Sequence, residues 1–175
     1  MKGPKVWVTT DNHFDHPNII KHGHRPGNHE ELQIEAFQRQ VNPQDIVFFL
    51  GDFCLGKPDN IRERLQQIPG RKMLVLGNHD SHVAYWYMNN GFDFAAEGIL
   101  YRDVWMTHKP ARWLPDGARV NLHGHLHDSD PQRHPHFVQP WHILLAIENQ
   151  AYKPVELDRY LINAENKLMT TIEVM

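Results

Sequence analysis

The stretch Leu74-Val75-Leu76-Gly77-Asn78-His79-Asp80, near the middle of the chain, decides the fold. Its apolar half has the length and composition of a short buried strand. Gly77 ends that run, and the three polar side chains that follow are types that bind metal ions or transfer protons. This stretch therefore predicts a strand whose carboxyl end carries reactive residues.

The same change from apolar strand to polar residues occurs at four other places. In each case an apolar segment comes directly before the polar residues: residues 6–10 before Asp11-Asn12-His13, residues 46–50 before Gly51-Asp52, residues 104–107 before His108, and residues 120–123 before Gly124-His125-Leu126-His127. Helical spacing over about 29–41 and 58–68 separates the first three strands, and this alternation predicts a parallel sheet. Ligands bind beyond the carboxyl ends of strands in such sheets, so we expect the five strand ends to form one site.

Length and composition predict one globular domain over residues 1–175, with 41% apolar and 22% charged residues. The net charge of −3 offers no general attraction to a polyanion, so no dedicated nucleic-acid patch is expected. No segment reads as a signal peptide or as a membrane span of about 20 apolar residues. The lone Cys54 permits no internal disulfide and no thiolate zinc site, and it fits the reducing cytoplasm.

Histidine is the unusual residue, with 14 copies that are scattered along the chain. Asp11 and His13 stand two residues apart, hence on one side of an extended segment, and His125 and His127 share this spacing. Asp52 has two carboxylate oxygens that could bridge two ions. Such oxygen and nitrogen ligands suit manganese, iron, zinc, cobalt or nickel, and two ions about 3.5–4 Å apart can clamp a phosphoryl group during in-line displacement.

The five segments, in this order, resemble the five motifs of the calcineurin-like metallophosphoesterase superfamily. The motifs are Asp11-Asn12-His13, Gly51-Asp52, Gly77-Asn78-His79-Asp80, His108 and Gly124-His125-Leu126-His127, which together run from residue 11 to residue 127. The resemblance implies an α/β fold in which two mixed β-sheets form a four-layer α-β-β-α sandwich. It also implies a metal-dependent phosphoric ester hydrolase.

The resemblance further implies a role for each motif residue. Asp11, His13 and His127 would hold a first divalent ion, and Asn78, His108 and His125 would hold a second, with manganese favoured. Asp52 would bridge the two ions, and a hydroxide between them would attack phosphorus. His79 would act as the catalytic proton donor to the leaving oxygen.

Residues 13–20 followed by Arg25-Pro26 resemble, more locally, the small stand-alone phosphoesterases of bacteria and phages. Proline and glycine predict a loop over residues 14–27. Because this loop follows a strand end that carries ligands, His16, Asn18 and Arg25 are candidate substrate-binding residues, together with Lys109. The substrate would be a small phosphate ester or a nucleotide-like molecule.

One position departs from the protein-phosphatase branch of the superfamily, where an aspartate three residues after the second-motif aspartate supports the catalytic histidine. Leu55 stands there, so another carboxylate would have to stabilise protonated His79, and Asp15 and Asp80 are the candidates.

The core uses nearly the whole chain and leaves little material for a lid, which favours an open site and phosphodiester substrates. A phosphomonoesterase of the same mechanism, or a catalytically weak metal-binding interaction module, is the alternative.

Overall fold

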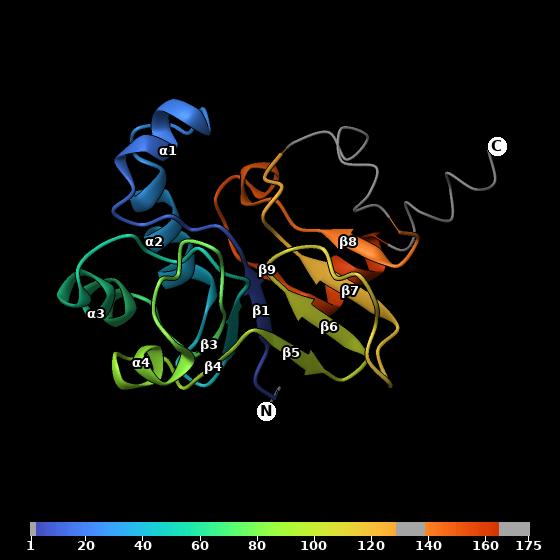
Figure 1. Ribbon diagram of the computed structural model, residues 1–175. Coiled ribbons are helices and arrows are strands. Elements are labelled where there is room, and N and C mark those ends of the chain that lie inside the picture. The colour runs from blue at the N-terminus through green and yellow to red at the C-terminus, as the bar shows by residue number, and fades with distance from the viewer. Residues whose placement is uncertain (1–2, 129–138, 165–175) are drawn as a thin grey trace.

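The first β-sheet forms the centre of the computed structural model, which describes residues 3–128 and 139–164 (Figure 1). Its strand order is β4-β3-β2-β1-β9. The strands are β1 (Val6–Thr9), β2 (Ile46–Phe49), β3 (Arg71–Val75), β4 (Phe94–Ala96) and β9 (Val155–Glu156). Strands β1 to β4 run parallel and β9 pairs antiparallel to β1. Their carboxyl ends therefore share one edge, as the alternation of strands and helices predicts.

Helices cover one face of this sheet, on the left of Figure 1. They are α1 (Pro17–His22), α2 (His29–Gln40), α3 (Pro58–Gln67) and α4 (Ala84–Asn89). The proline at the start of α3 suits the first turn, where no backbone donor is needed. Ile61 and Leu65 follow at helical spacing and join Phe37, Phe49 and other buried residues in the core between the helices and the sheet.

The second β-sheet packs against the other face of the first. Its order is β5-β6-β7-β8, comprising β5 (Gly98–Tyr101), β6 (Val104–Thr107), β7 (Val120–His123) and β8 (His142–Leu144). Strand β5 is antiparallel to β6, whereas β6, β7 and β8 are parallel. The core between the sheets contains Val8 and Phe48 from the first sheet and Met106 and Leu122 from the second. The first sheet is thus buried on both faces, which explains its nearly continuous apolar strands. The predicted α/β class with two mixed sheets is confirmed.

Several local predictions need correction. The expected loop over residues 14–27 contains α1, whose first residue is a proline and whose Ile19 is buried. The sequence predicts a strand over residues 143–147, but β8 ends at Leu144 and the 3-10 helix η3 (Ile147–Gln150) follows. It also predicts a short helix or turn over residues 155–161, where β9 is followed by a helix over residues 157–164. The sequence also predicts an irregular stretch over residues 128–140 and a last β segment over residues 169–174, but residues 129–138 and 165–175 lie outside the described ranges. No helix within the described ranges is both long and apolar enough to cross a membrane.

Candidate metal centre

Backbone hydrogen bonds join the loops that follow β1 and β2. Asp11 N–H donates to the Gly51 carbonyl oxygen at 3.0 Å, and His13 N–H donates to the Asp52 carbonyl oxygen at 2.9 Å. On the second sheet, Gly124 N–H donates to the carbonyl oxygen of His108 at 3.0 Å. These bonds extend the pairing of the strands past their carboxyl ends. The motif residues are therefore fixed by the two sheets even though they lie outside the strands.

The second predicted metal group is assembled around the imidazole of His108. Its Nε2 lies 3.0 Å from Asn78 Oδ1, 3.1 Å from His125 Nδ1 and 3.3 Å from Asp52 Oδ2. On the other side of the ring, Nδ1 lies 2.8 Å from the carbonyl oxygen of Leu50. That contact favours a proton on Nδ1 and leaves the Nε2 lone pair free to coordinate an ion. Four residues from four segments thus present ligand atoms to a common point.

The first predicted group comprises Asp11, His13 and His127. Asp11 Oδ1 lies 4.0 Å from His13 Nε2 and 3.8 Å from His127 Nε2. Asp11 Oδ1 and both ring nitrogens of His13 are buried and have no hydrogen-bond partner. Such orphaned polar atoms are rare because burying them costs about 1–3 kcal/mol each. A divalent ion would satisfy Asp11 Oδ1 and His13 Nε2, so these residues fit a metal site.

Asp52 connects the two groups. Its Oδ2 lies 3.3 Å from His108 Nε2 and 3.7 Å from His13 Nε2, one nitrogen from each group. Its Oδ1 accepts a hydrogen bond of 2.8 Å from the backbone N–H of His79. Burial alone would raise the pKa of Asp52, but its contacts with His108 and His79 lower it to about 2. The side chain is therefore a carboxylate at neutral pH, in the position that a bridging ligand needs.

The protonation of His13 and His125 suits metal binding, whereas carboxylate contacts outweigh burial and raise the pKa of His108, beside Asp52, and of His127, beside Glu148. Burial is the largest cause that lowers the pKa of His13 to about 2 and that of His125 to about 4. Both imidazoles are consequently neutral at neutral pH, which is the form that coordinates metals. Within the described residues, the metal-type clusters at this edge are Asp11, His13 and His127 in one group and Asp52, His108 and His125 in the other.

Two glycines permit the close approach of these segments. A Cβ on Gly77 would overlap a carboxylate oxygen and the backbone nitrogen of Asp52. A Cβ on Gly124 would overlap the hydroxyl of Thr10 and the carboxylate of Asp11. Any side chain at either position would push a ligand-bearing segment out of place.

His79 lies at the open side of the centre, with 45% of its side chain exposed. Its Nε2 is 3.9 Å from Asp52 Oδ2, and its ring lies 5.4 Å from that of His13 and 5.7 Å from that of His16. Among the residues that the structure describes, Asp52 provides the only carboxylate oxygen within 4.0 Å of the His79 ring nitrogens. The expected support of His79 by a second carboxylate is therefore not found.

Both carboxylates considered for that role are bound elsewhere. Asp15 Oδ1 forms an ion pair of 2.9 Å with Arg64. Asp80 accepts three backbone N–H bonds, from Asp52 at 2.8 Å, Phe53 at 3.2 Å and Gly77 at 2.7 Å. The sequence also predicts a helix over residues 81–88 with Asp80 or Ser81 as its cap, but α4 begins at Ala84, after Val83, so Asp80 does not cap it. Asp80 thus links the loop that follows β2 to the loop that follows β3.

Arg25 and Glu148 contact residues of the first predicted metal group and hold them in place. Glu148 Oε1 lies 2.9 Å from His127 Nδ1 and 2.6 Å from a terminal nitrogen of Arg25. That nitrogen of Arg25 also donates to the Asp11 carbonyl oxygen at 2.7 Å. The Arg25 side chain has no exposed surface, which argues against the substrate contact that we predicted for it. No sequence motif indicates Glu148, which lies on η3, 21 positions after His127.

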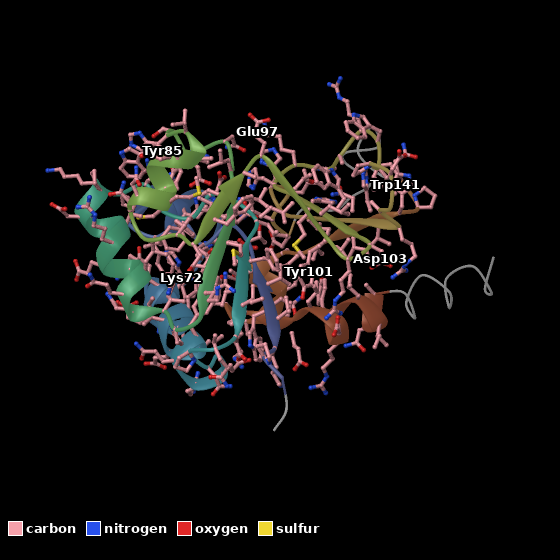
Figure 2. The ribbon with its side chains drawn as sticks, turned by 90° about the horizontal axis from the view of Figure 1, so that it is seen from below. Lys72, Tyr85, Glu97, Tyr101, Asp103 and Trp141 are labelled. Carbon is pink, nitrogen blue, oxygen red and sulfur yellow. The ribbon has the colours of Figure 1, made fainter. Side chains whose placement is uncertain are left out.

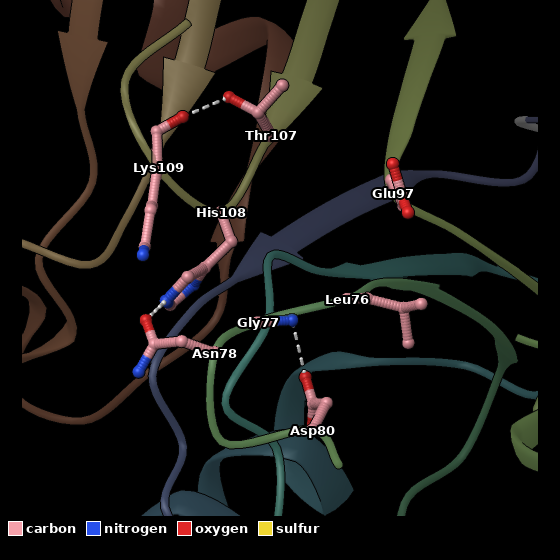
Figure 3. A pocket seen from close by; sticks show the side chains of 8 residues that line it. All are labelled: Leu76, Gly77, Asn78, Asp80, Glu97, Thr107, His108 and Lys109. Carbon is pink, nitrogen blue, oxygen red and sulfur yellow. Dashed lines mark hydrogen bonds between the residues drawn. The ribbon is translucent and has the colours of Figure 1, made fainter. Parts of the chain in front are cut away.

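The other candidate substrate residues surround the centre at different distances. His16 is half-buried, with its ring 5.1 Å from that of His13. Asn18 is exposed on α1. Lys109 is exposed and lines a pocket of about 450 Å³ together with Asn78 and His108 (Figure 3). Lys109 is thus the predicted cation that lies beside a metal group and is accessible to a ligand.

Two mixed sheets that pack face to face, with two candidate metal-ligand groups at one edge, are the arrangement expected of a metal-dependent phosphoesterase. The chain belongs to the calcineurin-like phosphoesterase family, whose profile matches residues 4–163. Phosphate esters are the substrates of this family, and divalent metals are its normal cofactors.

Relatives in archaea and phages resemble most of the chain. The uncharacterized protein MJ1445 of Methanocaldococcus jannaschii is 34% identical over 168 residues, which cover 90% of each chain. The gene 66 protein of Mycobacterium phage D29 is 26% identical over 186 residues, which cover 82% of this chain and 92% of the phage protein. The solved structure of AQ665, a protein of unknown function from Aquifex aeolicus, superposes with a TM-score of 0.70 at 23% identity, covering 90% of this chain and 97% of that chain. This last similarity supports the fold alone.

Proposed function

We propose that the protein is a two-metal phosphodiesterase that acts on small, nucleotide-like phosphate diesters. The observation that carries the proposal is the position of Asp52, whose Oδ2 lies within 3.7 Å of a nitrogen from each ligand group. A carboxylate shared in this way places two ions close enough to act on one phosphate. Manganese is the proposed ion, because the ligands are a mixture of carboxylate, amide and imidazole.

Of the proposed site residues, seven would be metal ligands and one would be a proton donor. Asp11, His13 and His127 would hold the first ion, Asn78, His108 and His125 the second, and Asp52 both. When bound, the ions would activate water and stabilise negative charge on the phosphate oxygens. His79 would give a proton to the leaving oxygen, and its exposed ring can regain that proton from solvent.

The open surroundings of the centre favour diesters over monoesters. His79 is 45% exposed and Asn78 is exposed too, so both ester groups of a diester have room. Lys109 and His16 would contact the phosphate or its substituents, and Asn18 is a more remote candidate. Arg25 would instead hold the Asp11 backbone in place.

The proposed compartment is the reducing cytoplasm, with which the buried Cys54, a free cysteine, agrees.

The test is hydrolysis of bis(p-nitrophenyl) phosphate by purified protein with Mn²⁺. We expect turnover that EDTA abolishes and that Asp52→Asn lowers at least 100-fold, whereas Asp59→Asn, at an exposed aspartate remote from the centre, keeps wild-type activity. Calorimetric titration with Mn²⁺ should give two ions per wild-type chain. A folded protein that binds the ions but hydrolyses no diester would refute the proposal, and faster cleavage of p-nitrophenyl phosphate would refute the preference for diesters.

A further inference from the structure

Strand register places Glu97 at the edge of the molecule that carries the metal centre. The last residue of β3, Val75, pairs with Ala96, and the last residue of β6, Thr107, pairs with Gly98. Glu97 lies between these two pairs, where the chain passes from the first sheet to the second. It is exposed, and Figure 2 shows it at the outside of the molecule. The fold thus brings one carboxylate that belongs to no motif next to the proposed active site.

Glu97 and Lys109 line the same pocket of about 450 Å³. Figure 3 shows Lys109 with Asn78 and His108 on one side and Glu97 on the other. Leu76 provides an apolar surface in the same pocket. The pocket is therefore continuous with the second metal group, since Asn78 and His108 belong to both.

The charged groups of Glu97 and Lys109 are not used by the fold. Across residues 3–128 and 139–164, the Glu97 carboxylate and the Lys109 ammonium form no ion pair and no side-chain hydrogen bond. The third charged residue of the pocket, Asp80, is different, because its carboxylate is bound to three backbone N–H groups. Glu97 and Lys109 are hence available to a ligand, with a negative and a positive group on opposite sides.

We propose that Glu97 determines substrate specificity by binding a nitrogen-bearing substituent of the phosphodiester. This inference rests on the proposed function, which locates the phosphate at the two ligand groups beside Lys109. The ester group that stays on phosphorus would then extend past Leu76 toward Glu97. A carboxylate there favours a substituent with an N–H donor or a cationic nitrogen over one with acceptors alone. A nucleobase and an amino alcohol are two sources of this chemistry.

Three esters with the same leaving group separate these sources. Thymidine 5′-(p-nitrophenyl phosphate) offers a neutral N–H, p-nitrophenyl phosphorylcholine offers a cation without N–H, and bis(p-nitrophenyl) phosphate offers neither. With Glu97→Leu, we expect the kcat/KM ratio of a nitrogen-bearing ester to bis(p-nitrophenyl) phosphate to fall five- to tenfold, mainly through KM. A fall for the thymidine ester identifies a nucleobase, and a fall for the choline ester alone identifies an amino alcohol. Glu35→Gln, an exposed glutamate on α2, is the matched control and should keep both ratios.

A binding measurement makes the inference independent of turnover. On the Mn²⁺-loaded protein, Glu97→Leu should raise the Kd of thymidine 5′-monophosphate or phosphocholine five- to tenfold relative to that of phenyl phosphate. If the wild type hydrolyses bis(p-nitrophenyl) phosphate but all ratios and Kd values match between Glu97→Leu and Glu35→Gln, the inference is wrong and the proposed function stands. If the wild type hydrolyses none of the esters, the proposed function fails, and the Kd comparison alone decides whether Glu97 recognises nitrogen.

Discussion

Replacement of Asp80 distinguishes a structural role for this carboxylate from a catalytic one. Asp80 Oδ2 accepts the N–H groups of Asp52 and Gly77, and Oδ1 accepts that of Phe53. In Asp80→Asn the amide oxygen can keep the first two bonds, but the amide NH₂ then faces the Phe53 N–H. In Asp80→Ala all three donors lose their partner.

The expected loss in the free energy of unfolding follows from these hydrogen bonds. One hydrogen bond to a charged acceptor contributes about 1.5–3 kcal/mol, and one buried donor without a partner costs about 1–3 kcal/mol. Burial raises the pKa of Asp80, so part of the gain is offset by the cost of burying its charge. We therefore expect Asp80→Asn to lower the free energy of unfolding by about 2 kcal/mol and Asp80→Ala by about 4 kcal/mol. Urea unfolding at pH 7 with EDTA measures both, and Asp59→Asn is the neutral control.

Metal affinity and the pH profile complete this test. Because Asp80 fixes the loops that carry Asp52 and Asn78, calorimetry should show Mn²⁺ binding 10- to 100-fold more weakly in Asp80→Asn. The alkaline limb of the kcat/KM profile at saturating Mn²⁺ should stay in place. If Asp80 instead stabilised protonated His79, its loss would move that limb to lower pH. Unchanged stability and metal affinity together with a shifted limb would refute our interpretation.

Three further predictions concern residues around the candidate metal centre. Glu148→Gln should weaken Mn²⁺ binding 10- to 100-fold in calorimetry, because His127 loses its charged acceptor, and unaltered affinity would exclude a supporting role. Burial lowers the pKa of His123 to about 4, so its folded form binds fewer protons, and this residue alone should cost the metal-free protein up to about 3 kcal/mol of stability between pH 6.5 and 4. His123→Gln should flatten this slope in urea unfolding, whereas the exposed His24→Gln should not. Gly124→Ala should abolish binding of one of two Mn²⁺ ions, because its Cβ would overlap Asp11, and full occupancy in calorimetry would contradict this.

The sequence predicted which residues lie together at the sheet edge because local rules govern their positions. A strand followed at once by a polar residue places that residue at the sheet edge, and parallel strands share their edges. Asp11, Asp52 and Asn78 follow from this reasoning, with His108 coming from the second sheet. The structure brings these residues together as two groups at one edge.

The supporting residues could not be predicted because their contacts are distant in sequence. Arg25 and Glu148 are separated by 123 positions, and Asp80 accepts bonds from residues 27 and 28 positions away. The local sequence around a charged residue does not distinguish one that is buried in this way from one that contacts substrate. Burial of Arg25 and the three bonds of Asp80 follow only from tertiary packing.

The backbone of the ligands explains why such support is needed. Asp11, His13, Asp52, His125 and His127 have φ values of 47°, 50°, 53°, 69° and 51°, in the left-handed region. That region costs a residue other than glycine about 1–2 kcal/mol. Without other interactions, these segments would relax and the ligand atoms would separate. Arg25 opposes this through the Asp11 carbonyl, and Asp80 opposes it through the Asp52 N–H. Residues outside the proposed ligand set therefore maintain the geometry of the candidate metal centre, and we expect their loss to weaken metal binding before the fold is lost.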